Sequence, residues 1–463
     1  MRHLKILPIL LSALFMLAGC KKDFLDPKPS TTIVAPGPLA DLQALLENAN
    51  VLNSCTPALS LIASDDYIFL DYASWQSAST PTERNSYIWA RDIYAGATGI
   101  PDWNLGYTAI YYCNNVLDML DKITARDTEI KQYNLIKGWA HFVRAYTYYD
   151  LARNFSPAYE PSKATTALGL PIRLKGAIDE VQQRSSLKQT YDQILSDIAV
   201  SRNVLGAITS GNSNRPSLAA AFALYSRIYL GMHDYDKAEL YADSAIQLRG
   251  KLIDYNTISP TASSPFDINN EETIYSTSSV NNYYLIAFNA IYNTQVTINP
   301  ELIQLYEPND LRLTVYFRQN TATKSLYVRR GYFRADLPFS GLATDELYLT
   351  KAECLARRNE VAPALNWVNQ LLIKRFPPSG FKPLIAKDKT EALDKILNER
   401  RKELVWRTLR WSDLKRLNAE GANITLTRVL NGEVFTLPAN DPRYVFPIPD
   451  DEINTSKIQQ NNR

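Results

Sequence analysis

The sequence predicts a mainly α-helical protein in which paired helices form a scaffold that carries long irregular insertions and a little β structure. Two observations lead to this prediction. Apolar residues recur at helical spacing in several long segments. Between these segments lie stretches rich in Asn, Ser, Thr and Tyr that keep no sustained period.

The chain begins with a segment typical of secretion signals. A short basic start is followed by Ile6–Leu17, which is almost wholly apolar and shorter than the roughly 20 residues that span a membrane. Residues 1–19 are therefore predicted to be a signal peptide. The sequence LAGC ending at Cys20 resembles a lipobox, which implies cleavage before Cys20 and lipidation of its sulfur; an ordinary signal peptide with an incidental cysteine is the alternative. We expect 20–35 to be a lipidated tether and 36–463 a single domain.

Charge and cysteine content limit the partners and the sources of stability. The chain has 50 Lys and Arg against 48 Asp and Glu, and this balance argues against nucleic acid or an anionic membrane surface as a partner. Cys55, Cys113 and Cys354 remain beside the lipidated one, an odd number that cannot form a complete disulfide framework. Cys113 and Cys354 lie in helical apolar patterns, so buried free thiols are predicted there.

Helical periodicity is clearest in the first half of the chain and at two helical hairpins. Single helices are predicted over 39–52, 103–123, 129–153 and 188–204, the last capped by Ser186. Pro216–Leu230 leads through a tight turn into Tyr235–Leu248, and Asp345–Arg358 leads likewise into Val361–Ile373. Small alanines allow each pair to approach closely. The pairs resemble tetratricopeptide hairpins, but they are not in tandem, so no open superhelical solenoid is expected.

Two insertions and a C-terminal region complete the chain. The insertions span about 64–100 and 257–335, and the second contains strand-like runs at Thr273–Tyr275 and Leu326–Val328. Helix returns over Glu391–Leu417. A small hairpin is predicted within Gly421–Ile448, followed by an exposed tail.

Three segments resemble the SusD/RagB family of Bacteroidota. The start CKKDFLDPKPS resembles the family's mature N-terminus, Asn398–Leu417 resembles its late Arg-Trp-x-Asp-Leu-x-Arg signature, and Tyr444–Asn454 resembles its closing motif. This resemblance implies a lipid-anchored outer-membrane protein that faces the cell exterior. Such a protein has a tetratricopeptide-like scaffold, captures an oligosaccharide or occasionally a peptide, and passes it to a SusC-like TonB-dependent transporter. By themselves, Arg410 and Arg416 of the signature indicate helix-fixing ion pairs.

The insertions supply the candidate ligand-binding residues. A sugar site needs flat rings to cover C–H faces and polar groups to pair with hydroxyls, and loops on a rigid frame are the natural place for both. We single out Asp66, Tyr67, Tyr72, Trp75, Trp89, Asn282, Tyr283 and Tyr284, with Trp75 first because polar neighbours suggest an exposed turn. The alternative is that these rings pin the loops to the scaffold.

Two rival functions stay open. A lipid-anchored glycoside hydrolase would need two opposed carboxylates, which the sequence supplies in plenty. However, no His-Glu-x-x-His, Gly-x-Ser-x-Gly or phosphate-binding glycine motif is present, so no enzyme is expected. No Asp-x-Asp-x-Asp-Gly calcium loop is present either, and no cofactor or metal is expected. The other rival is a protein-interaction scaffold that binds no small ligand.

Overall fold

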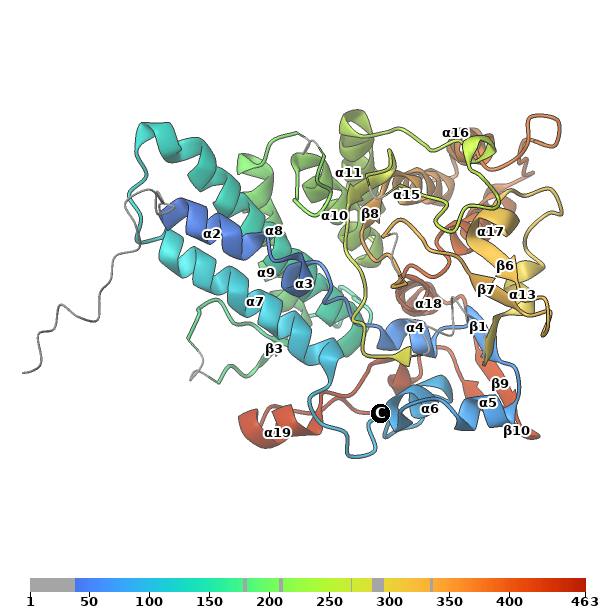
Figure 1. Cartoon of the computed structure of the whole chain (residues 1–463), viewed down its shortest axis with the longest axis horizontal. Helices are drawn as coiled ribbons and strands as arrows, with labels where there is room; N and C mark the ends of the chain where they lie inside the picture. The colour runs from blue at the N-terminus through green and yellow to red at the C-terminus, as the bar shows by residue number, and fades with distance from the viewer. Residues whose placement is uncertain (1–37, 178–180, 208–210, 268, 285–294, 334–335) are drawn as a thin grey trace, which may run out of the picture. The chain divides into compact units, whose positions relative to one another are not determined.

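The computed structural model describes residues 38–177, 181–207, 211–267, 269–284, 295–333 and 336–463 (Figure 1). The chain divides into two compact units, Met1–Asp41 and Leu42–Arg463. Of the first unit, the structure describes only the beginning of helix α2 (Pro38–Leu46). Cys20, the predicted signal peptide and the predicted tether lie outside the described residues. Within the described part, no helix is long and apolar enough to cross a membrane.

The scaffold is a series of helices in which each packs against the next, through both predicted hairpins (Figure 1). Its members are α7 (Pro101–Leu120), α8 (Ile130–Phe155), α9 (Leu187–Val204), α10 (Leu218–Gly231), α11 (Tyr235–Leu248), α15 (Thr344–Arg357), α16 (Val361–Leu372) and α17 (Lys389–Glu403). Helices α11 and α15 are in contact although the second insertion separates them in sequence. The two hairpins therefore stand side by side, because the insertion leaves the series and returns to it. Ala238, Ala242 and Ala245 of α11 are fully buried, which permits the close approach.

Polar side chains cap the N-termini of several of these helices. The Ser186 hydroxyl accepts a hydrogen bond from the backbone amide of Gln189 at 3.1 Å. The Gln189 side-chain oxygen accepts in return from the backbone amide of Ser186, which completes a capping box. The predicted cap of α9 is thus confirmed. Ser217 and Asp234 cap α10 and α11 with a single bond each, accepting from the backbone amide three residues further along.

The β structure among the described residues consists of antiparallel two-stranded pairs. These are β1 (Tyr67–Phe69) with β5 (Val296–Ile298), β2 (Leu168–Pro171) with β3 (Arg184–Ser186), β4 (Thr273–Tyr275) with β8 (Leu342–Ala343), β6 (Phe317–Gln319) with β7 (Leu326–Val328), and β9 (Leu426–Leu430) with β10 (Glu433–Leu437). The strands predicted at β4 and β7 and the C-terminal hairpin are confirmed. Most importantly, β1 and β5 join the first insertion to the second, with Tyr67 opposite Ile298.

The first insertion holds more regular structure than its sequence suggested. Besides β1 it contains α5 (Tyr72–Gln76) and α6 (Pro81–Tyr87), and α4 (Leu59–Ala63) directly precedes it. The predicted helix over 39–52 is also divided, because α3 (Ala49–Leu52) starts anew after α2. Short helical pieces also occur elsewhere, at α13 (Pro300–Ile303), α14 (Arg312–Tyr316), η3 (Asp127–Glu129), η4 (Tyr255–Thr257) and η6 (Pro442–Tyr444).

The prediction of a single helix over Glu391–Leu417 is wrong, because the helix breaks in the middle of this range. Helix α17 stops at Glu403, and α18 (Arg410–Ala419) begins after an irregular stretch in which Trp406 and Thr408 have positive φ angles of 62° and 59°. This turn directs Arg407 inward, where its two Nη atoms donate to the Asp345 carboxylate at 2.9 and 2.6 Å. A buried ion pair therefore overrides the local helical preference.

The exposed tail is also a wrong prediction. After the closing motif the chain forms α19 (Asp450–Ser456), and Ile458 beyond it is only 2% exposed. The Gln460 side chain exchanges two hydrogen bonds with the backbone of Ile448, at 2.8 and 2.7 Å. The Asn461 amide donates to the carbonyls of Phe155 and Phe446. These bonds fasten the last residues to the scaffold.

The cysteine prediction is confirmed. Cys113 on α7 and Cys354 on α15 are free and buried, and so is Cys55. Burial raises the pKa of the Cys55 thiol to about 12, which keeps the thiol protonated and unreactive.

Candidate functional site

The structure divides the predicted ligand-binding residues into two groups. Asp66, Tyr67, Trp89 and Tyr283 are buried. Tyr72, Tyr284 and Asn282 are exposed, and Trp75 is half-buried. The second group presents its side chains to solvent and can meet a ligand there in this conformation.

The buried aromatic residues hold the first insertion in place. The Tyr67 hydroxyl donates to the Ile62 carbonyl at 2.9 Å, and its ring packs edge-on against Trp406. Trp89 is 1% exposed, and its Nε1 donates to the Ala63 carbonyl at 2.9 Å. Arg428 from β9 lies over the Trp89 ring, 4.6 Å from its centroid. These contacts pin the loop to the scaffold, which is the alternative to ligand binding for these rings.

Tyr283 fastens the second insertion to the scaffold. Its hydroxyl donates to Oδ2 of Asp102, in the first turn of α7, at 2.5 Å. The other oxygen of Asp102 accepts from the amides of Ala58 and Leu59 at 2.6 and 2.9 Å. One buried carboxylate therefore connects the second insertion and the start of α4 to the scaffold, and Tyr284, next to Tyr283, remains exposed.

Tyr72 and Trp75 form an exposed aromatic pair on α5, which we call the α5 aromatic pair. Asp71 caps this short helix by accepting from the Ser74 amide at 2.7 Å. The two ring centroids are 5.4 Å apart and the planes are tilted by 30°. Tyr72 is 37% exposed, whereas the Trp75 Nε1 donates to the Arg84 carbonyl at 3.1 Å. One edge of the indole is thus anchored while the pair still faces solvent.

The second insertion lies directly beside this pair. Helix α5 follows β1, which pairs with β5, and Leu70 donates to the Gln295 carbonyl at 2.9 Å. The Gln295 side chain in turn donates to the Ser77 hydroxyl at the end of α5. Rings and amides from two distant segments therefore meet on one surface, which is what binding a polyhydroxylated ligand requires.

Asp66 lines a separate cavity of about 570 Å³ beside α17 and α18. Its neighbour Asp65 is held by Arg410, whose Nε and Nη2 donate at 2.7 and 2.8 Å, and by Arg401 at 2.8 Å. Burial acts to raise the pKa of Asp65, but Arg410 and Arg401 lower it overall. Burial and the charge of Asp65 raise the pKa of Asp66 to about 6.

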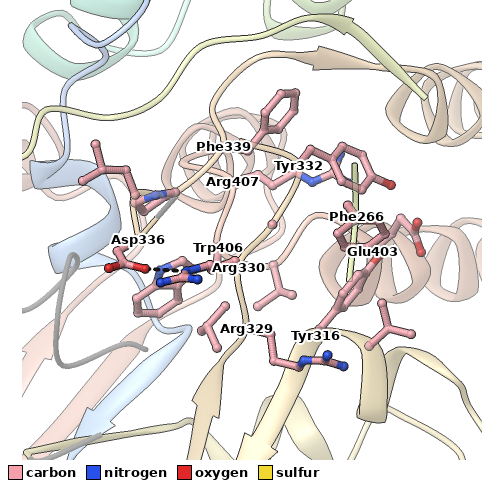
Figure 2. A pocket seen from close by; sticks show the side chains of 16 residues that line it. Phe266, Tyr316, Arg329, Arg330, Tyr332, Asp336, Phe339, Glu403, Trp406 and Arg407 are labelled. Carbon is pink, nitrogen blue, oxygen red and sulfur yellow. Dashed lines mark hydrogen bonds and ion pairs between the residues drawn. The ribbon is translucent and has the colours of Figure 1, made fainter. Parts of the chain in front are cut away.

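A smaller cavity lies where the second insertion meets the break between α17 and α18 (Figure 2). It is rich in aromatic rings, including Phe266, Tyr332 and Trp406, and the Arg330 Nε donates to Asp336 at 2.6 Å at its side. Its volume of about 50 Å³ has room for roughly one or two waters, so a sugar ring cannot enter it in this conformation.

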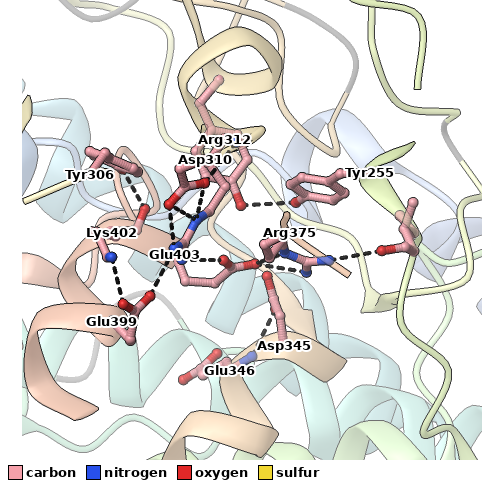
Figure 3. A network of polar contacts seen from close by, with 12 residues as sticks. Tyr255, Tyr306, Asp310, Arg312, Asp345, Glu346, Arg375, Glu399, Lys402 and Glu403 are labelled. Carbon is pink, nitrogen blue, oxygen red and sulfur yellow. Dashed lines mark hydrogen bonds and ion pairs between the residues drawn. The ribbon is translucent and has the colours of Figure 1, made fainter. Parts of the chain in front are cut away.

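A buried ionic network underlies this region (Figure 3). Arg312 donates to Asp310, Glu399 and Glu403 at 2.7 to 3.1 Å. The Arg375 Nη2 lies 2.7 Å from Glu403 and 2.8 Å from Glu272. Sequence reasoning missed both arginines, because apart from Asp310 their partners come from remote segments.

Three buried carboxylates of this region lie close enough together to suggest a cation site. They belong to Glu272, Asp345 and Glu403. However, Arg375 is bonded to Glu272 and Glu403, and Arg407 is bonded to Asp345. The guanidinium groups already supply the compensating positive charge, so this cluster serves the fold.

The ion pairs predicted for the signature helix are confirmed. Arg410 binds Asp65 through Nε and Nη2, and Arg416 binds Glu353 of α15 through Nη1 and Nη2, at 2.6 and 2.8 Å. The signature therefore joins the late helices to the first insertion and to the second hairpin.

Comparisons with known proteins agree with this architecture. Residues 23–230 match a family model described as "Starch-binding associating with outer membrane", and residues 342–463 match the SusD family model. A SusD-like protein from Formosa agariphila is 24% identical over 389 residues, which cover 68% of this chain and 72% of that protein.

Solved structures share the fold across nearly the whole chain. A SusD superfamily protein from Bacteroides thetaiotaomicron has a TM-score of 0.74 at 21% identity, covering 92% of this chain and 100% of that one. Surface glycan-binding protein A from Bacteroides fluxus has a TM-score of 0.70 at 19% identity, covering 92% and 99%. A putative sugar-binding protein from Bacteroides vulgatus has a TM-score of 0.72 at 22% identity, covering 91% and 98%.

Proposed function

The chain belongs to the SusD/RagB family, and from this premise we propose that it is a non-catalytic nutrient-binding lipoprotein of the outer membrane. Lipidated at Cys20 and facing the cell exterior, it captures an oligosaccharide and passes it to a SusC-like TonB-dependent transporter. The starch-binding description of the matching family model and the glycan-binding name of a structural relative support a sugar over a peptide.

The observation that carries the proposal is the exposed α5 aromatic pair. A stable fold does not require Tyr72 and Trp75 to stay at the surface, because burial of such large side chains would be favourable. Their rings offer apolar faces to the C–H surface of a sugar, and amide and hydroxyl groups of Gln295 and Ser77 lie next to them. Asn282 and Tyr284 of the second insertion are exposed and are proposed as further contacts.

A binding role fits the carboxylates better than catalysis does. Hydrolysis of a glycosidic bond needs two carboxyl groups opposed across an open site. Burial raises the pKa of four acidic residues, and all four are buried away from the surface: Asp66, Asp102, Glu272 and Asp345. Glu272 is also bonded to Arg375. The α5 aromatic pair has Asp71 beside it, and that carboxylate caps the helix. We therefore expect binding without turnover.

Calorimetry on the protein made from Lys21 onward tests the proposal against a panel of plant, fungal and host oligosaccharides and peptides. We expect at least one oligosaccharide to bind and to be recovered intact. Trp75→Ala should strongly weaken that binding. Trp367→Ala on α16 is the matched control, because Trp367 is also a half-buried tryptophan and should leave affinity unchanged.

Other results would point elsewhere. Binding that survives Trp75→Ala and Tyr72→Ala would exclude the α5 aromatic pair as the main site. Product formation would contradict the non-catalytic role. If no ligand binds but the protein still captures a TonB-dependent barrel, the interaction-scaffold function replaces this one.

A further inference from the structure

We propose that a groove along helix α7 is a second binding site for a neutral oligosaccharide, separate from the α5 aromatic pair. The groove measures about 420 Å³, within the range of roughly 300–1,000 Å³ typical of small-molecule sites. Asn104, Tyr107, Thr108 and Tyr111 of α7 form a first wall, and Trp103, Pro171, Arg173 and Glu452 complete the lining. None of these residues belongs to either insertion.

The first wall is one face of α7. Residues 104, 107, 108 and 111 follow the spacing of three and four that places helical side chains above one another. Tyr107 is fixed, because its hydroxyl donates to the Pro171 carbonyl at 2.9 Å and its ring lies 4.8 Å from that of Trp103. Tyr111, one turn further along, is 40% exposed.

Ordinary packing explains Tyr107 but leaves Tyr111 and Asn104 without a structural task. The Tyr111 ring has one aromatic neighbour, Tyr112, at 6.4 Å, and its hydroxyl has no hydrogen-bond partner among the described residues. The Asn104 side-chain amide likewise has no hydrogen-bond partner among the residues that the structure describes. Thr108 donates to the backbone carbonyl of Asn104 at 2.8 Å. A ring and an amide with unused bonding capacity therefore line the same groove.

The lining residues outside α7 include one positive and one negative group. The Arg173 guanidinium lies 5.6 Å from the centroid of Tyr107, and its Nη2 is 3.7 Å from Oε1 of Glu452 on α19. The Arg173 backbone is fixed, because its amide donates to the Tyr148 hydroxyl at 2.7 Å and its carbonyl accepts from that hydroxyl at 2.7 Å. At 3.7 Å the pair is longer than a direct charged hydrogen bond, so oxygen atoms of a ligand can bridge it.

This combination favours a neutral polyhydroxylated ligand. The single positive and single negative charge cancel, which argues against an anionic or cationic ligand. The Tyr111 ring suits the C–H face of a sugar, and the amide, guanidinium and carboxylate groups suit its hydroxyls. Because α7 is scaffold, such a site would hold a long glycan while the α5 aromatic pair binds another part of it or another chain.

The test uses the mature lipoprotein in a detergent without a sugar headgroup, titrated calorimetrically with maltoheptaose, cellohexaose and xylohexaose. We expect two sites per chain for at least one of these probes. Tyr111→Ala should weaken one site about tenfold or more, as the loss of a stacked ring predicts, and Asn104→Ala should weaken the same site. Tyr133→Ala, at a half-buried tyrosine on α8, is the control and should change neither site.

The variants separate this inference from the proposed function. Residual binding in Trp75→Ala that disappears in Trp75→Ala/Tyr111→Ala supports both sites. If Tyr111→Ala and Asn104→Ala bind like the wild type, the α7 site is overturned and the proposed function stands. If Tyr111→Ala abolishes all binding and Trp75→Ala has no effect, the α7 site stands and the α5 assignment fails. If none of the probes binds, the α7 site is overturned. This holds even if Tyr111→Ala weakens the capture of a barrel.

Discussion

Arg227 on α10 and Glu346 on α15 form a bidentate ion pair in the interior, with Nε donating to Oε1 at 2.9 Å and Nη2 donating to Oε2 at 2.6 Å. Both side chains are at most 4% exposed. Arg227 also donates to the carbonyls of Ser340 and Gly341, where the second insertion rejoins the scaffold. One guanidinium thus fixes the two helical hairpins and the return of the insertion together.

Removing one member of this pair should destabilise the fold strongly. Glu346→Gln leaves Arg227 buried without its counterion, and breaking such a pair lowers the free energy of unfolding by about 3–5 kcal/mol. Denaturant titration of the purified protein measures this loss. Lys188→Ala, in the exposed pair with Asp192, should cause no measurable loss, and a similar loss in both variants would contradict the prediction.

How far the sequence predicts the structure depends on the range of the forces at each site. The hairpins α10–α11 and α15–α16 could be predicted because apolar spacing and small residues act locally. The break between α17 and α18 could not, because it depends on Arg407 reaching Asp345 across the fold. The site shows the same limit: Trp75 and Trp89 both stand in polar, aromatic-rich sequence, and only tertiary contacts decide which ring is buried.

Truncation of these two tryptophans should have different effects, one on stability and the other on sugar binding. Trp89→Ala removes a buried ring and its hydrogen bond to Ala63, so we expect a loss of about 3–5 kcal/mol in the free energy of unfolding. Trp75→Ala removes a half-buried ring and should cost much less stability while it reduces sugar binding. Thermal unfolding and calorimetry on both variants check this. A Trp89→Ala protein as stable as the wild type would refute the pinning role.

Asp66 should make stability depend on pH. Its pKa is about 6 in the folded protein and roughly 3.9 in an unfolded chain, so the folded state binds the proton more tightly. The stabilising contribution of protonated Asp66 is complete below pH 4 and is lost as pH rises through 6, by up to about 3 kcal/mol. The unfolding free energy of the wild type minus that of Asp66→Asn should therefore fall as the pH rises from 4 through 6.

The neighbouring carboxylate provides the contrast for this measurement. The pKa of Asp65 is lowered overall, because Arg410 and Arg401 outweigh the raising effect of burial, so its contribution is present above roughly pH 4 and is lost in acid. The gap between wild type and Asp65→Asn should stay level between pH 5 and 7 and shrink only in more acidic solution. A flat gap for Asp66→Asn would show that Asp66 ionises normally, and a rising gap would show that its pKa is lowered rather than raised.

The turn between β9 and β10 should be the most sensitive point of the C-terminal hairpin. Asn431 and Gly432 both have positive φ, at 50° and 81°, between the paired residues Leu430 and Glu433, as a type I′ turn requires. Gly432→Ala places a side chain where that conformation costs about 1–2 kcal/mol. Hydrogen exchange of the β9 and β10 amides should then accelerate roughly 5- to 30-fold.

The effect of this substitution should extend to the first insertion. Arg428 of β9 donates to the backbone carbonyls of Tyr87 and Ser64, and its guanidinium lies 3.6 Å from the centroid of the Tyr87 ring. Opening of the hairpin therefore releases the segment that supports α5, and exchange should also accelerate there. Gly206→Ala is the control, because a Cβ at Gly206 meets open space without a positive φ. Equal exchange in the two variants would mean that the hairpin does not depend on the turn.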